Sequence, residues 1–239
     1  MFIINFPCLP IKSKEIFCLR EKFGQLLNVN PLSTMYIHRL NHWENEPEVI
    51  DFIRKNAFAS LISQVDGRPW ATHLPFVLEK KSTGEVVLHG HLAKANSQWK
   101  SIREGEEVLV TFQGPHAYIS SSWYNHENVP TWNYLAVHVY GKIRIIEGDE
   151  LMHHLKSLVN IYEEGRPNRV HVETMSEAYV EGQIRALVGI EISITEVQAS
   201  AKLSQNRDEV NYQHIIKKLE ESEFPMDKEV AEEMRKRRS

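Results

Sequence analysis

Residues 58–75, FASLISQVDGRPWATHLP, decide the fold, because two strand-like runs flank the turn pair Asp66-Gly67. Valine, isoleucine and aromatic residues favour strands, and Asp-Gly is a preferred centre for a two-residue hairpin turn. The stretch therefore predicts a β-hairpin built from Phe58–Val65 and Pro69–Leu78. Because proline cannot donate a hydrogen bond to a sheet, Pro75 indicates an edge strand, a bulge or a place where a ligand replaces the missing pairing.

The rest of the chain adds further strands and surrounds them with helices. A helix is expected over residues 46–56, because Asn45 can cap it and Pro47 suits its first turn. Further strands are expected at Glu85–His91, Glu107–Gln113, Trp132–Ile146 and Ala186–Val197, and further helices at Asn96–Arg103, from Asp149, at Ser176–Gln183, at Tyr212–Leu219 and from Asp227. These elements do not alternate as βαβ units do, which favours a mainly antiparallel β-barrel with peripheral helices over a parallel sheet.

The sequence divides into three parts. Residues 1–34 are interrupted by Pro7, Pro10 and Pro31, and we expect an N-terminal extension there that is not part of the fold. Residues 35–207 are expected to form the barrel domain with its inserted helices. Residues 208–239 are expected to form a C-terminal helical tail, since apolar residues recur there at helical spacing.

Composition limits the classes of function. The 239 residues are 42% hydrophobic and carry a formal charge of −4, so the chain can bury a core but does not attract nucleic acid as a whole. Its basic cluster, Arg235–Arg238, follows several glutamates and is interpreted as a solvated helix end. Cys8 and Cys18 form no disulfide or zinc pattern, which suits the cytoplasm, and neither a signal peptide nor a membrane span is expected.

Four polar and aromatic strings stand where core packing would favour aliphatic residues, and we expect them to line one pocket. They are Ala71–Pro75, His89–Asn96, Gln113–Tyr118 and Val129–Tyr134. Strand ends and turns are where ligand sites usually lie. The aromatic residues of the last string suit a dimer interface as well as a planar ligand, because one edge of such a ring is apolar and the other polar.

The string from His89 to Asn96 has the layout of a phosphate site. His89 and His91 lie on one face of a strand end, and Lys94 precedes a helix that Asn96 or Ser97 can cap. Unpaired backbone N–H groups at a helix start bind anions, and a lysine adds a full charge. A plain helix cap beside a solvated lysine explains the same residues, so both interpretations remain open.

Other chemistries have weaker support in the sequence. The histidines of the strings could bind a metal ion or haem, but no acidic or thiol partner recurs beside them at ligand spacing. The motifs G-x-S-x-G, H-E-x-x-H, G-x-G-x-x-G and the P-loop are all absent, which disfavours hydrolase and nucleotide-triphosphate chemistry.

The strings together resemble the PaiB family of FMN-binding negative transcriptional regulators. The resemblance rests on Met35–Ile37, Ala71–Pro75, Gly90–Asn96, Phe112–Ser120, Val129–Tyr134, Val137–Gly141 and Lys202–Arg207, and it runs from Met35 to the C-terminus. It implies an FMN-binding split β-barrel, a superfamily that includes flavin reductases and pyridoxamine-phosphate oxidases and that usually forms homodimers.

Carried onto this chain, the resemblance implies a flavin site with three parts. Thr72, His73, Leu74 and Pro75 would lie along the isoalloxazine ring; His89, Gly90 and His91 would flank the ribityl chain; and Lys94 and Asn96 would hold the phosphate. Gln113, Thr131 and Trp132 are further candidate lining residues. The oxidases surround the phosphate with arginine and lysine, whereas Lys94 is the only such residue between His89 and Gln98.

We therefore expect an FMN-binding, homodimeric regulator or redox-linked sensor, with a DNA or regulatory protein partner as a further possibility. Two alternatives stay open at this point. One is a flavin-dependent oxidoreductase that uses NAD(P)H and a small acceptor, and the other is a haem-binding split-barrel protein. The sequence names no catalytic residue, because flavin chemistry needs only binding and orientation from the protein.

Overall fold

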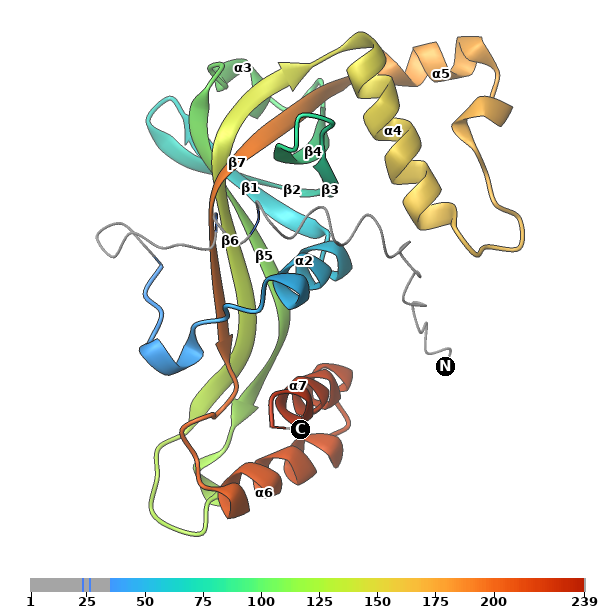
Figure 1. Ribbon diagram of the computed structural model, residues 1–239. Helices are drawn as coiled ribbons and strands as arrows, with labels where there is room; N and C mark the ends of the chain where they lie inside the picture. Colours follow the sequence, from blue (N-terminus) through green and yellow to red (C-terminus); the bar gives the residue numbers. More distant parts are fainter. Residues whose placement is uncertain (1–22, 24–25, 27–34, 239) are drawn as a thin grey trace.

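A computed structural model describes Phe23, Leu26 and residues 35–238 of the chain (Figure 1). Its centre is a seven-stranded sheet with the order β2-β1-β5-β6-β7-β4-β3, in which all neighbours pair antiparallel. The strands are β1 Phe58–Val65, β2 Arg68–Pro75, β3 Val77–Lys80, β4 Val86–Ala93, β5 Glu106–Ile119, β6 Thr131–Ile146 and β7 Leu187–Lys202. The expected antiparallel fold is confirmed.

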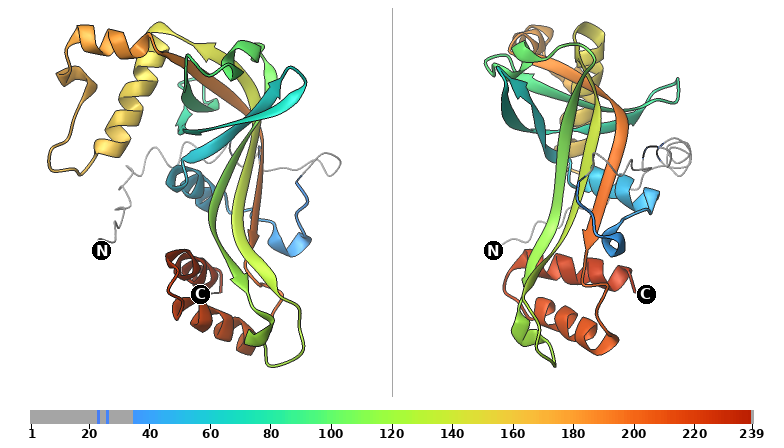
Figure 2. Two further views of the ribbon diagram at one scale, coloured as in Figure 1. Left: turned by 180° about the vertical axis from the view of Figure 1, so that it is seen from behind. Right: turned by 90° about the vertical axis from the view of Figure 1, so that its left-hand side faces the viewer.

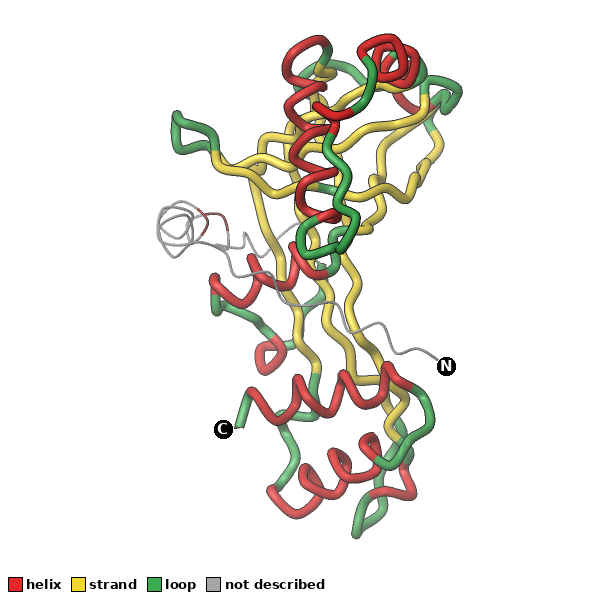
Figure 3. Tube along the Cα trace, turned by 90° about the vertical axis from the view of Figure 1, so that its right-hand side faces the viewer, coloured by secondary structure: helices red, strands yellow, loops and turns green. Residues whose placement is uncertain are grey.

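Helices lie at the periphery of this sheet (Figures 1 and 3). The α-helices are α2 Glu46–Lys55, α3 Gln98–Ser101, α4 Gly148–Glu163, α5 Glu177–Ile184, α6 Glu209–Glu220 and α7 Pro225–Lys236, and the 3-10 helices are η1 Arg39–Asn41, η2 Ser121–Trp123 and η3 Val172–Thr174. As expected, Asn45 caps α2 by accepting a hydrogen bond from the backbone of Glu48. The helix expected at Asn96–Arg103 shortens to the four residues of α3, because Ile102 already has an extended backbone.

The hairpin of β1 and β2 forms as the sequence predicts. Asp66 and Gly67 both have positive φ angles, 50° and 75°, as a two-residue turn between twisted strands requires. The predicted second strand is divided after Pro75, however, because the chain crosses there to the other end of the sheet and continues as β3. Pro75 thus ends an edge strand, one of the alternatives that its missing N–H indicated.

The sheet curls until its two ends meet, which closes the upper part of the molecule into a barrel (Figure 2). Gly90 of β4 faces the barrel interior, where a Cβ atom would lie 2.8 Å from Leu74 Cδ1 and 3.2 Å from Phe76 Cε1. Glycine is therefore needed at this point for close packing between β4 and the segment that leaves β2.

Strands β5, β6 and β7 continue beyond the barrel as a long ribbon that reaches α6 and α7 (Figures 1 and 2). The predicted ends of two of them were too early. Strand β5 passes Gln113 and runs to Ile119 through a register shift, and β7 runs to Lys202. Gly114 lies in that shift, against the ring of Phe52 on α2. The strand was predicted to end just before Gly114-Pro115, because glycine and proline often interrupt strands.

The C-terminal residues form the expected helical unit and pack on the ribbon. The Tyr212 hydroxyl donates to the Met234 carbonyl at 2.7 Å, and Arg238 stacks on the Tyr212 ring with its guanidinium 3.9 Å from the ring centre. Arg237 stacks on Trp43 at 4.5 Å and pairs with Glu48. These two arginines, expected to be solvated, instead hold α7 against the rest of the molecule.

The N-terminal extension falls largely outside the described residues. Two of its residues are described, and Phe23 is completely buried in the hydrophobic core while Leu26 packs against that core. The side chain of Phe23 is therefore part of the folded unit.

Candidate functional site

A hydrogen-bonded cluster joins β2 to the segment before α3. The Thr72 hydroxyl donates to Gln98 Oε1 at 2.5 Å and accepts from Asn96 Nδ2 at 2.9 Å. Gln98 is completely buried and donates from Nε2 to Ser63 Oγ at 2.9 Å. Two residues predicted for the flavin, Thr72 and Asn96, are thus brought into direct contact from distant parts of the sequence.

Lys94 lies on the turn that leads from β4 into α3. The turn is fixed at both ends, since the Lys94 N–H donates to the Ala186 carbonyl at 2.8 Å and the Trp99 indole donates to the Lys94 carbonyl at 2.9 Å. The ammonium group is exposed. Because α3 is only four residues long, the anion-binding contribution of a helix start is smaller here than the sequence indicated.

The remaining residues of the predicted ring-facing strand have different environments. His73 is exposed and its Nδ1 lies 2.7 Å from Ser60 Oγ on β1, whereas the Leu74 side chain is buried in the core. Pro75 is half-buried. Within the described residues β2 pairs with one strand, β1, while its Thr72 hydroxyl and Trp70 carbonyl bond to side chains of Asn96 and Gln98.

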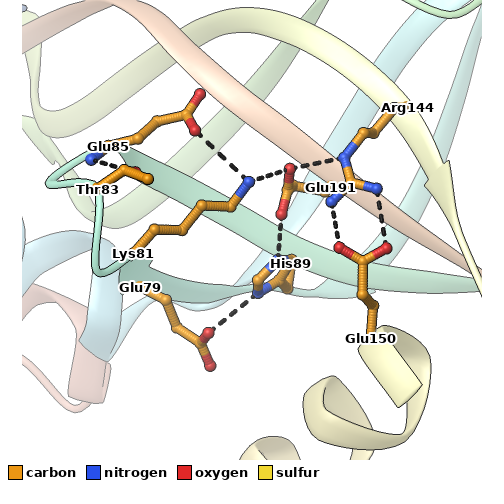
Figure 4. A network of polar contacts seen from close by, with 8 residues as sticks. All are labelled: Glu79, Lys81, Thr83, Glu85, His89, Arg144, Glu150 and Glu191. Atoms are coloured by element: carbon orange, nitrogen blue, oxygen red, sulfur yellow. Dashed lines mark hydrogen bonds and ion pairs between the residues drawn. The ribbon is translucent and has the colours of Figure 1, made fainter.

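His89 and His91, two residues apart on β4, both lie beside His154 of α4, and His89 is surrounded by charged groups (Figure 4). His89 is buried and contacts Glu79 through Nδ1 at 3.1 Å and Glu191 through Nε2 at 2.8 Å. Burial alone would lower the pKa of His89, but the bonds and charges of the two glutamates raise it above its ordinary value. The two carboxylates therefore favour the protonated form of His89.

Glu191 is the centre of this charged network. Its side chain is 2% exposed and contacts Lys81 at 2.6 Å, Arg144 at 2.8 Å and His89. Burial alone would raise the pKa of Glu191, but its three cationic partners lower it to about 2. Arg144 in turn binds Glu150, so the network ties the start of α4 to the sheet.

His91 contacts α4 directly. Its Nδ1 lies 3.1 Å from Nε2 of His154, a completely buried residue of the helix. Burial and the nearby His91 and His89 lower the pKa of His154 to about 3, so this pair is neutral at pH 7. The two strand histidines thus support the helix, and among the described residues no three His, Cys, Asp or Glu side chains are arranged so that they could hold a metal ion.

The last three predicted lining residues lie elsewhere in the chain. Gln113 is exposed near the register shift of β5, and the Thr131 hydroxyl accepts a hydrogen bond from Lys202. Trp132 is 53% exposed and packs edge to face against Tyr118. Thr131 and Trp132 begin β6 near α6, at the opposite end of the ribbon from α3, so the four strings do not line one pocket within a single chain (Figure 1).

Four residues of these contacts were not predicted from the sequence: Gln98, Ser60, Glu191 and His154. Gln98 follows Asn96 closely, but its burial depends on the fold of β1 over α3. Glu191 did leave a signal, because it is a lone carboxylate within the apolar run Leu187–Ile194. Such a residue indicates a buried ion pair.

The chain is similar in sequence to a protein family and to several known proteins. The family described as "Putative FMN-binding domain" matches residues 35–196. The "Protease synthase and sporulation protein PAI 2" of Bacillus subtilis is 44% identical over 200 residues, which cover 84% of this chain and 96% of that protein. An uncharacterized protein of Saccharomyces cerevisiae is 38% identical over 116 residues, covering 46% of this chain and 69% of that protein.

Solved structures share the fold at low sequence identity. The flavocytochrome Anf3 of Azotobacter vinelandii has a TM-score of 0.57 and 18% identity, with 77% of this chain and 80% of that chain covered. The FAD and heme binding protein of Mycobacterium smegmatis has a TM-score of 0.50 and 16% identity, with 70% and 76% covered. No helix among the described residues is long and apolar enough to cross a membrane.

Proposed function

Since the chain belongs to the family described as "Putative FMN-binding domain" and matches PAI 2 over most of its length, we propose that it is an FMN-binding split-barrel regulator or flavin-linked sensor. The observation that carries the proposal is the contact between Thr72 and Asn96, which joins two of the strings that resemble the family's flavin site. Bound FMN would supply redox chemistry, and the chain would supply binding and orientation.

The contact also supports a proposed direction for the flavin. Asn96 and Lys94 belong to one turn and meet β2 at Thr72, so the phosphate end lies near Thr72 and the isoalloxazine ring lies along the strand toward Pro75. From Thr72 to Pro75 an extended strand advances about 10 Å, which matches the reach from the phosphate to the ring. His89, Gly90 and His91 then act beneath the site, by packing and by holding α4.

The proposed assembly is a homodimer. On the outer face of the sheet, Ile62, Leu109 and Tyr140 form one half-exposed row across β1, β5 and β6, since each residue pairs with the next. A second row, Ser60, Thr111 and His138, lies beside it. This mixture of apolar, aromatic and polar groups suits a contact between copies.

A second copy would also complete the flavin site. Thr131 and Trp132 begin β6 at the far end of the ribbon, so they can approach Thr72 only from a partner subunit. Gln113 lies on the ribbon between these ends. An interface along the outer face would bring the aromatic start of β6 in one subunit toward the Lys94 turn of the other.

The regulatory role follows from the family resemblance, and the charge distribution limits how it is exercised. Arg237 and Arg238 are engaged with aromatic rings and carboxylates rather than presented as a basic surface. We therefore favour regulation through a protein partner or through the flavin's redox state over direct DNA binding. A cytoplasmic location fits cysteines confined to Cys8 and Cys18.

The first experiment is an absorption spectrum of freshly purified protein followed by titration with FMN, read as fluorescence quenching. Lys94→Gln should weaken FMN binding about fivefold, the effect of one exposed charge on a phosphate, and the weakening should shrink in high salt. Lys218→Gln on α6 is the matched control and should leave binding unchanged. A colourless protein that fails to quench micromolar FMN would contradict flavin binding, and a Soret band would point to haem instead.

The shared site is tested by mixing two variants. Lys94→Glu and Trp132→Ala should each weaken FMN binding, and their mixed dimers should recover it at one site per dimer, which is about a quarter of all sites after free exchange. Mixing that restores nothing would argue against a contribution from the partner. Leu109→Glu should shift sedimentation toward the monomer, whereas Gln64→Glu should not.

A further inference from the structure

Gln98 has a fixed amide orientation, because backbone groups surround one end of it. Its Nε2 lies 3.4 Å from the carbonyls of Leu61 and Trp70 and 2.9 Å from Ser63 Oγ. Carbonyl oxygens can only accept hydrogen bonds, so the NH2 group must face them. The other end, Oε1, must then face Thr72.

This orientation determines the role of the Thr72 hydroxyl. Gln98 Oε1 can only accept, so the single hydroxyl proton of Thr72 is donated to it at 2.5 Å. Turning that proton toward a ligand would leave a completely buried amide oxygen without its donor, which is unfavourable. Thr72 therefore faces a ligand as an acceptor.

Asn96 is oriented in the same way. Its Oδ1 accepts from the backbone N–H of Gln98 at 3.0 Å, so its NH2 group faces Thr72 and donates to the hydroxyl oxygen at 2.9 Å. A side-chain NH2 group has two hydrogens and a hydroxyl oxygen has two lone pairs. After these bonds, Asn96 retains one hydrogen and Thr72 retains one lone pair, and both side chains are half-buried.

The pair thus offers one acceptor beside one donor. A neutral hydroxyl satisfies both, because it donates to Thr72 and accepts from Asn96. A phosphate dianion only accepts, so its oxygens would face the lone pair of Thr72 and gain a single hydrogen bond from Asn96.

We propose that Gln98 is a positioning residue that commits Thr72 as an acceptor, so that Thr72 and Asn96 recognise a hydroxyl of the flavin's ribityl chain and not its phosphate. The inference rests on the proposed flavin binding and refines it. Asn96, expected at the phosphate, acts on the ribityl chain, and the phosphate is left to Lys94 and its turn. Discrimination between FMN and riboflavin is therefore small, about tenfold or less.

The test compares three ligands: FMN, riboflavin, and lumiflavin, which has the ring without the ribityl chain. Thr72→Val should weaken FMN and riboflavin by the same factor, about fivefold for one hydrogen bond, and should leave lumiflavin unchanged. Thr72→Ser retains the hydroxyl and should behave as the wild type. Thr174→Val on η3 is the matched control. Gln98→Met frees the Thr72 proton and should raise the preference for FMN over riboflavin.

Other results of the three-ligand comparison would contradict particular parts of the proposal. If Thr72→Val weakens FMN alone, Thr72 donates to the phosphate and the inference is wrong. If all three ligands weaken equally, Thr72 acts on the ring or on the structure of the site, which also overturns it. A wild-type preference for FMN above about 100-fold contradicts the limited phosphate recognition. If none of the three ligands binds the wild type, it is the proposed flavin function that fails.

Discussion

Replacement of Glu191 by glutamine should destabilise the fold, because it removes the carboxylate at the centre of the charged network. The pKa of this carboxyl falls from 4.5 to about 2 in the folded state, which corresponds to roughly 3 kcal/mol of folding free energy. Breaking a buried pair costs roughly 3–5 kcal/mol when it leaves an isolated charge. Here Arg144 retains Glu150, Lys81 retains Glu85 and His89 retains Glu79, so no cation is isolated. We expect Glu191→Gln to lower the unfolding free energy by about 2–3 kcal/mol at pH 7.

The loss of unfolding free energy caused by Glu191→Gln should become smaller as the pH falls. A carboxyl with a lowered pKa contributes fully above its unfolded pKa of 4.5 and loses that contribution as the pH falls toward about 2. The deficit of Glu191→Gln should therefore be complete at pH 7 and reduced to less than half near pH 3. The difference in unfolding free energy between the variant and the wild type is measured by urea denaturation, monitored by tryptophan fluorescence at one fixed protein concentration. Urea is used because it adds no salt.

A surface variant, Glu107→Gln, serves as the control, because it removes a carboxylate that is paired but exposed. Glu107 lies 3.8 Å from Lys142 with both side chains at least half exposed, so Glu107→Gln should change the unfolding free energy by less than about 0.5 kcal/mol. A Glu191→Gln deficit as small as that of the control, or one that does not shrink in acid, would refute the assignment of Glu191 as a stabilising centre.

Three further variants test neighbouring parts of the structure. Gly189→Ala would place a Cβ atom 2.8 Å from the Ile146 carbonyl oxygen and 2.9 Å from Leu151 Cδ1. The thermal midpoint of unfolding should therefore fall by an amount equivalent to about 1–3 kcal/mol. An unchanged midpoint would contradict the close packing of α4 against β7. His154 has a folded pKa of about 3 against 6.5 when unfolded, so it is neutral in both states above pH 6.5. As the pH falls below 6.5 the unfolded state takes up a proton that the folded state does not, and this destabilises the fold. His154→Asn should therefore show a smaller loss of stability than the wild type between about pH 6.5 and 5, and equal slopes would contradict it. Asn45→Ala removes the cap of α2 and should cost about 1 kcal/mol in urea denaturation, while Asn128→Ala, on a loop, serves as the control.

Local patterns in the sequence were sufficient for most of the elements. Asp66-Gly67 specified the first hairpin, and Asn45 with Pro47 specified the start of α2, because turns and caps depend on a few adjacent residues. Element lengths were less predictable. Strand β5 continues through Gly114-Pro115 because it pairs with β6 on both sides of a register shift, and that long-range pairing is not encoded within the strand.

The candidate site was partly predictable for the same reason. The sequence predicted Thr72, Lys94 and Asn96 as ligand-binding residues, because polar groups at a strand and a turn indicate a ligand, and the structure brings Thr72 and Asn96 into contact. It also predicted His89 and His91 beside the flavin, but it gave no indication of their contacts with Glu191 and His154, residues about a hundred and about sixty positions further along the chain. Such partners are chosen by strand order and helix docking, which no local pattern encodes.

The sequence by itself determined the antiparallel class, the hairpin at residues 58–75, the helical C-terminus and the family's ligand. Tertiary structure alone decided which polar residues meet. Closure of the barrel brings Gln98 under β1 and thereby orients Thr72, and the length of the ribbon carries Trp132 away from the same chain's Lys94 turn. The physical reason is that turns and strands follow from neighbouring residues, whereas the direction of a hydrogen bond in a site depends on which buried groups the whole fold leaves to accept it.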